Sequence, residues 1–170
     1  MKLAQRIALG LALATGAGSV VFNPVSPDLH TAIVRFEGRR LAPYRDPVGI
    51  WTVCAGVTNR AVPGAVRPGK RYSEAECYQL EEKILRKNAE ALSELLPQVG
   101  QGQWDALMDF SYNVGLYALQ HSTLLRKLKA GDCLGAAAEF SRWGKAQGKP
   151  LSGLRIRRAW EAGKFRAECQ

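Results

Sequence analysis

Two acidic residues and a hydroxyl lie close together in the sequence: Glu37, Asp46 and Thr52 fall within the stretch FEGRRLAPYRDPVGIWTVCAG. Cleavage of a glycosidic bond needs one carboxyl group that holds a proton and donates it to the leaving oxygen. It also needs an ionised carboxylate that activates water or stabilises the positive charge of the transition state. A glutamate with a nearby aspartate supplies both groups, although two solvated surface carboxylates would show the same spacing.

Local patterns predict the elements that would position these residues. Apolar residues at helical spacing predict a helix that begins with Asp28 as its cap and stops at Gly38, so that Glu37 ends it. The turn-forming run DPVG between apolar segments predicts a short β-hairpin. Asp46 then falls in the turn of the hairpin and Thr52 in its returning strand.

The rest of the chain predicts a mainly helical body. The stretch 56–71 is rich in glycine, proline and basic residues, which favours a long turn or a small irregular sheet. Ser73 and Glu76 form a capping box that opens a long helix through about Leu96. Further amphipathic helices follow to the end of the chain. We therefore predict an α+β fold in which a long helix joins a small hairpin lobe, with the catalytic residues, to a helical lobe.

Composition narrows the class of partner. The chain has 170 residues and a formal net charge of +9, which suits one basic domain that is attracted to polyanions. Nucleic acid, anionic lipid and bacterial cell wall all carry such charge, but the sequence has no finger, RNA-reading or phosphate-loop motif. We therefore expect no nucleic acid partner, and we expect the protein to be a monomer.

The amino terminus has the pattern of an export signal. Lys2 and Arg6 precede an uncharged segment over 7–22, in which glycine and alanine are frequent. Such a helix is only weakly hydrophobic, so that its insertion into a membrane is close to balance. We expect residues 1–27 to form a signal-anchor and linker that can leave the membrane uncleaved, and 28–170 to form the catalytic domain. A cleaved signal peptide, a permanent anchor and a soluble buried helix are the alternatives.

Four cysteines, an even number, would reach an oxidising compartment after export. Their spacing contains no CxxC pair, and only His30 and His121 could assist in binding zinc, so we expect no metal and no cofactor. Disulfides are plausible instead, and all three pairings of the cysteines remain open. The cysteines are Cys54, Cys77, Cys133 and Cys169.

Four stretches together resemble one known family, the phage-type lysozymes or endolysins of glycoside hydrolase family 24. These stretches are FEGRRLAPYRDPVGIWTVCAGVT, PGKRYSEAEC, QWDALMDFSYNVG and RWGKAQGKPLSGLRIRRAWE. The resemblance implies a lysozyme-like fold and a muramidase that hydrolyses the β-1,4 bond between N-acetylmuramic acid and N-acetylglucosamine in peptidoglycan. The amino terminus resembles the subgroup that is held inactive on the inner membrane, facing the periplasm, until its signal-anchor is released.

The resemblance also implies roles for the three residues. Glu37 would be the general acid, Asp46 the base that activates water, and Thr52 the residue that orients this water. Such a single displacement inverts the anomeric carbon, and inverting enzymes separate their carboxyl groups by about 6.5–9.5 Å against roughly 5–5.5 Å in retaining enzymes. The sequence alone decides neither distance nor stereochemistry.

Several alternatives remain open at this point. A lytic transglycosylase would need only one acid/base glutamate, and a noncatalytic wall- or membrane-binding protein would not need Glu37. Arg155, Arg157 and Arg158 can be read as a solvated helix face, as partners of the active-site glutamate or as contacts with the anionic cell wall. Asn113 can be read as a substrate contact or as a structural cap. Tryptophans in amphipathic patterns are more often core residues than sugar-stacking platforms.

Overall fold

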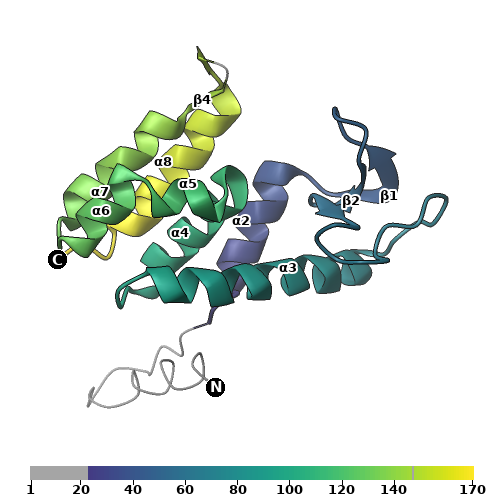
Figure 1. Cartoon of the computed structure of the whole chain (residues 1–170), viewed down its shortest axis with the longest axis horizontal. Helices are drawn as coiled ribbons and strands as arrows, with labels where there is room; N and C mark the ends of the chain where they lie inside the picture. The colour runs from purple at the N-terminus through teal and green to yellow at the C-terminus, as the bar shows by residue number, and fades with distance from the viewer. Residues whose placement is uncertain (1–22, 147) are drawn as a thin grey trace.

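Helices and short strands form two lobes joined by one long helix (Figure 1). The computed structural model describes residues 23–146 and 148–170. The elements are α2 (Pro27–Glu37), β1 (Arg40–Arg45), β2 (Trp51–Cys54), β3 (Val57–Thr58), α3 (Glu74–Leu95), α4 (Gln101–Val114), α5 (Leu116–Gln120), α6 (Thr123–Lys129), α7 (Cys133–Glu139), a 3-10 turn (Phe140–Trp143), β4 (Lys145–Ala146), β5 (Lys149–Pro150) and α8 (Ser152–Arg166). The predicted α+β architecture is confirmed.

Helix α2 begins two residues earlier than the sequence suggested. Its N-cap is Ser26, whose Oγ accepts a hydrogen bond from the Leu29 amide at 3.0 Å and donates to Asp105 Oδ2 at 2.8 Å. The prediction that Asp28 is the cap was wrong, because the serine already serves the free amides of the first turn. Asp28 lies within that turn and pairs with Lys164 at 2.6 Å.

The end of α2 agrees with the prediction. Gly38 has a φ of 72°, and its amide donates to the Val34 carbonyl at 3.0 Å. Glycine reaches this backbone conformation without steric cost, which lets the chain leave the helix sharply. Strand β1 starts two residues later, so Glu37 occupies the junction between the helix and the sheet.

The first two strands form the predicted hairpin, and a third strand extends it into a sheet with the order β1-β2-β3. Tyr44 pairs with Thr52 across β1 and β2, and Thr52 pairs with Thr58 across β2 and β3. Asp46 lies in the connecting turn. Strand β3 occupies the start of the segment for which the sequence predicted a turn or an irregular sheet.

Helix α3 packs into the cores of both lobes. Its predicted capping box is present, since Ser73 Oγ accepts from the Glu76 amide at 3.1 Å and the Glu76 carboxylate accepts from the Ser73 amide at 2.8 Å. Cys77 at its start belongs to the core of the sheet lobe, whereas Leu85 and Leu92 belong to the core of the helical lobe. Figure 1 shows α3 running beneath both lobes, so it fixes them together.

The structure resolves which cysteines pair. Cys54 at the end of β2 is bonded to Cys77 on α3, and Cys133 at the start of α7 is bonded to Cys169 near the carboxyl end. The first bond ties the hairpin to the long helix. The second ties α7 to the tail that follows α8.

No helix in the described part of the chain is both long and apolar enough to cross a membrane. The predicted anchor segment, which precedes Asn23, lies outside the described residues.

Candidate active site at the junction of the lobes

Glu37 presents its carboxylate at the last residue of α2. The side chain is 29% exposed, and Oε1 accepts a hydrogen bond from Arg157 Nη1 at 2.6 Å. Arg157 comes from α8, 120 residues further along the chain. The carboxylate therefore combines access to solvent with one fixed, charged partner.

Arg157 is buried and held from three sides. Its Nε donates to Asp109 Oδ2 at 2.8 Å and its Nη2 to Asp109 Oδ1 at 2.9 Å, which is a two-pronged contact with α4. Phe36, next to Glu37, places its ring centroid 5.3 Å from the guanidinium carbon. Burial opposes the charge, but the bonds to Asp109 and Glu37 outweigh it and raise the pKa of Arg157. Arg157 thus stays charged and rigid behind Glu37.

Arg158 forms a second buried pair on the same helix. Its Nη2 lies 2.8 Å from Glu161 Oε1 and donates to Asn113 Oδ1 at 3.0 Å. Its guanidinium also lies over the Phe110 ring, 4.8 Å from the centroid. The reading of a solvated helix face is therefore wrong for Arg157 and Arg158, and Asn113 has a structural bond.

Asp46 is fixed by the turn that it occupies. Its Oδ1 accepts from the Val48 amide at 3.0 Å and from the Ile50 amide at 2.8 Å. Its own amide donates to the Ile50 carbonyl at 3.0 Å, which closes the hairpin. These bonds fix the orientation of the Asp46 carboxylate within the turn.

Thr52 lies on β2 and is 4% exposed. Its Oγ1 donates to the Ile50 carbonyl at 3.2 Å. Thr52 and Tyr44 are paired across the hairpin, and Asp46 lies in the turn just beyond the end of β1. Within the described residues, Glu37, Asp46 and Thr52 are hydrogen-bonded to other partners and not to one another.

A buried carboxylate joins the elements that carry these side chains. Glu81 on α3 is 1% exposed, accepts from the Ala55 amide at 2.9 Å and lies 2.9 Å from His30 Nε2 on α2. Arg39, between α2 and β1, also pairs with it. Glu81 therefore links helix α2, the start of β1, the end of β2 and the long helix at one point.

A tyrosine connects helix α4 to the same group of contacts around Glu81. Tyr112 Oη donates to the Ala55 carbonyl at 2.8 Å. Burial, with the nearby Glu37 and Glu81 charges, raises the pKa of Tyr112 above its usual range, so the phenol remains a donor. Burial also lowers the pKa of His30, against the opposing effect of Glu81. The imidazole contacts Glu81 through Nε2, which lies 2.9 Å from Glu81 Oε2.

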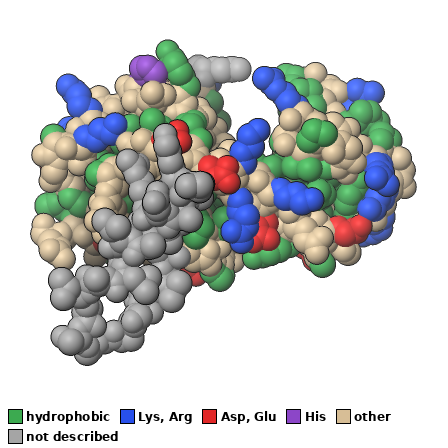
Figure 2. Space-filling model, turned by 60° about the horizontal axis from the view of Figure 1, so that its bottom comes forward, with side chains coloured by type: hydrophobic (Ala, Val, Ile, Leu, Met, Phe, Trp, Pro, Cys, Tyr) green, Lys and Arg blue, Asp and Glu red, His purple; other side chains and the backbone are tan. Residues whose placement is uncertain are grey.

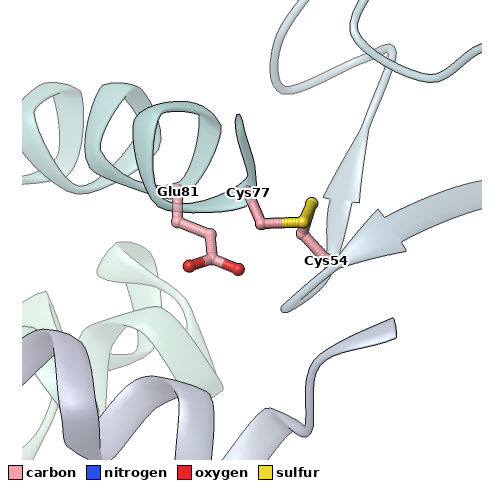
Figure 3. Close-up of side chains that lie close together, drawn as sticks. All are labelled: Cys54, Cys77 and Glu81. Carbon is pink, nitrogen blue, oxygen red and sulfur yellow. A yellow bond between two sulfur atoms is a disulfide. The ribbon is translucent and has the colours of Figure 1, made fainter. Parts of the chain in front are cut away.

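Figure 3 shows Glu81 beside the Cys54–Cys77 disulfide. In the described part of the chain, these three residues are the group of potential ligand atoms that lie close enough together to hold a metal ion. The disulfide removes both thiolates as ligands. The group therefore acts as a covalent and polar brace for the hairpin.

Sequence reasoning did not single out Glu81 or Asp109 for the site. Both residues carried a usable signal: Glu81 stands at helical spacing between Cys77 and Leu85 on the buried stripe of α3, and Asp109 interrupts the apolar run ALMDF. A carboxylate on a buried stripe must be paired with a hydrogen-bond or charge partner. The sequence pattern therefore predicts that each carboxylate has a partner. It does not predict that the partner of Asp109 is Arg157 or that the partner of Glu81 is Arg39.

Comparisons with known proteins identify the family of the chain. The family model of the phage lysozymes matches residues 34–161. The SAR-endolysin of Enterobacteria phage PA-2 is 36% identical over 155 residues, which cover 89% of this chain and 90% of that protein.

Solved structures give the same answer for the fold. The endolysin from Escherichia coli O157:H7 phage FAHEc1 superposes with a TM-score of 0.73 at 30% sequence identity. The match covers 83% of this chain and 92% of that protein's chain. The muramidase domain of SpmX from Asticaccaulis excentricus has a TM-score of 0.74 at 29% identity and covers 83% of this chain and 96% of its own. The chain belongs to the phage lysozyme family: it is an endolysin, a muramidase that hydrolyses peptidoglycan.

Proposed function

We propose that Glu37 is the general acid of this muramidase, that Asp46 is the base that activates water, and that Thr52 orients this water. The observation that carries the proposal is the position of Glu37, a partly exposed carboxylate at the junction of the lobes with a buried arginine behind it. A group so fixed can protonate the glycosidic oxygen of a bound glycan. The Asp46 amide and Thr52 Oγ1 both donate to the Ile50 carbonyl, which ties the two residues to the same point of the hairpin.

In this proposal, the general acid and the base come from different lobes. Helix α2 and the helical lobe hold the acid, whereas the turn of the sheet lobe holds the base. In this proposal a water molecule lies between Glu37 and Asp46, and its attack inverts the anomeric carbon. We also propose that the enzyme works as a monomer, with Glu37, Asp46 and Thr52 contributed by the same copy of the chain.

Replacement of each carboxylate by its amide tests both roles. We expect Glu37→Gln and Asp46→Asn to keep the fold and to lose cleavage of purified peptidoglycan. Full activity in either variant would remove that residue from the mechanism.

The basic surface suits the substrate. Figure 2 shows lysine and arginine side chains gathered over the end of the molecule that carries the strands. With a formal net charge of +9, the protein is attracted to polyanions such as the bacterial cell wall. We infer that the positive charge of the protein attracts it to the cell wall, whereas the active site selects the bond that is cleaved.

We also propose that residues 1–27 are a releasable signal-anchor and linker, and that 28–170 form the catalytic domain. The enzyme would be exported, held on the inner membrane facing the periplasm, and then released into the periplasm. The weak hydrophobicity of residues 7–22 supports this proposal, as does the name of the PA-2 relative, SAR-endolysin. Asn23 and Gln101 exchange hydrogen bonds at 2.8 and 2.9 Å, so the segment would leave the body directly at α4.

Fractionation of expressing cells over time tests the anchor. We expect the full-length chain first in the membrane fraction and later in the soluble periplasmic fraction, with Met1 still present by mass spectrometry. As a matched control, Gly16→Leu with Gly18→Leu makes the segment more hydrophobic, which should keep the chain in the membrane. A soluble product that lacks the amino-terminal segment would instead indicate a cleaved signal peptide.

A further inference from the structure

We propose that Asp109 is a positioning residue that sets the pH range of catalysis through Arg157, because its carboxylate offsets the positive charge that Arg157 places against Glu37. This inference rests on the assignment of Glu37 as the acid. Asp109 lies on α4 and is 0% exposed, so it does not contact the substrate. Its effect must pass through the arginine.

The geometry makes Asp109 the main partner of Arg157. Two nitrogens of Arg157 donate to the two carboxylate oxygens of Asp109 at 2.8 and 2.9 Å, and Nη2 also donates to the Asp109 carbonyl at 3.3 Å. The remaining nitrogen, Nη1, donates to Glu37. One guanidinium therefore bridges a buried carboxylate and the exposed catalytic one, and its orientation toward Glu37 is fixed by Asp109.

The other charged groups around Glu37 are committed elsewhere. On α8, Glu161 lies 2.8 Å from Arg158, 3.7 Å from Arg157 and against Asp109. Burial, followed by the hydrogen bond to Asp109, raises the pKa of Glu161 well above its usual range, so this carboxyl group is protonated and carries no charge that could balance Arg157 near neutral pH. On α4, Tyr112 donates to the Ala55 carbonyl. Toward the sheet lobe, Arg39 and His30 both pair with Glu81. Asp109 is thus the group whose charge is placed to balance Arg157.

A general acid beside an arginine faces a conflict. The arginine holds the side chain in place, but its positive charge favours the ionised form, which has no proton to donate. The negative charge of Asp109 reduces this effect on Glu37. If this charge is removed, Arg157 acts on Glu37 without compensation, and the acid loses its proton at a lower pH. In a plot of kcat/KM against pH, the fall in activity on the alkaline side then occurs at a lower pH.

The test is the pH profile of kcat/KM for Asp109→Asn in the full chain, measured by the release of reducing ends from purified peptidoglycan. The amide keeps the size of the side chain and removes its charge. We expect the alkaline limb to move to lower pH by about one unit, because an adjacent charge shifts the pKa of a carboxyl group by roughly 1–3 units, whereas Asp109 acts across the guanidinium of Arg157 and Glu37 is partly exposed. Asp109→Ser removes the same charge and carries the same prediction.

Asp105 provides a matched control one turn earlier on α4. It is also buried, at 1% exposure, but its carboxylate is held by the neutral groups of Ser26 and Gln101, both at 2.8 Å. Asp105→Asn should leave the alkaline limb where it is in the native enzyme, whatever its effect on thermal stability. If Asp109 had only a structural role, Asp109→Asn would lower activity or stability but would leave the alkaline limb of the pH profile in place.

Each outcome decides the matter. An unmoved limb in Asp109→Asn, or an equal shift in Asp105→Asn, would overturn the proposal. If neither Asp109 variant folds while Asp105→Asn does, Asp109 is structural and the proposal fails. Glu37→Gln separates this inference from the one beneath it: full activity there would reject the assignment of the acid, whereas an inactive Glu37→Gln with an unmoved limb in Asp109→Asn rejects only the role of Asp109.

Discussion

A Glu37→Gln variant is expected to fold as the native enzyme does and to cleave peptidoglycan about a thousandfold more slowly, within the range that general acid catalysis contributes. Glutamine has the size of glutamate but no acidic proton to give to the leaving oxygen. Its amide oxygen can still accept the bond from Arg157 Nη1, which Asp109 holds in place. The rate is measured as reducing ends released from purified peptidoglycan, and the fold by the midpoint of urea unfolding.

Glu82→Gln is a closely matched control for this variant. The Glu82 side chain is 28% exposed against 29% for Glu37, and each carboxylate lies 2.6 Å from an arginine, Arg86 in the case of Glu82. The difference is that Glu82 lies on the surface of α3. We expect its amide variant to retain native activity. Equal losses in the two variants, or near-native activity in Glu37→Gln, would contradict the assigned role.

The second large effect is expected for Asp46→Asn, which should lower the rate about a hundredfold or more. An asparagine Oδ1 can accept the same amide bonds from Val48 and Ile50, so the turn should persist. What disappears is the negative charge that would take a proton from water. The same two measurements, rate and urea midpoint, separate a lost base from a lost turn.

Asp132→Asn controls for the loss of an aspartate from such a position. Asp132 Oδ1 accepts from the Gly135 amide at 2.8 Å at the start of α7, in another turn where a carboxylate caps the backbone. This variant should keep native activity. If Asp46→Asn were also active, the base would have to be another group, and inversion would lose its support.

Local signals explain why much of the fold could be predicted. Ser73 with Glu76 caps α3, and Gly38 ends α2, because both effects act within a few residues of backbone. The hairpin followed from a turn run between two apolar segments. The cap of α2 was misplaced because Ser26 and Asp28 are both good cap residues, and the choice depends on Asp105, 79 residues away.

The supporting part of the site could not be predicted in the same way. Arg157 and Arg158 look like a solvated face, since helical spacing alone does not show that α4 supplies Asp109 as a partner. Burial of such charges is stable only where partners meet them, and those partners are fixed by the packing of the whole helical lobe. The cysteine pairing was open for the same reason: three pairings fit the sequence, and only the fold selects Cys54 with Cys77.

The most direct test of the central claim is the configuration of the first product. Proton NMR of soluble peptidoglycan strands, recorded early in the reaction and before mutarotation, reports the anomer formed at the new reducing end. With Glu37 as the acid on one side and water activated by Asp46 on the other, the β-linked substrate should give the α-anomer first. Initial release of the β-anomer would show retention and would contradict the account.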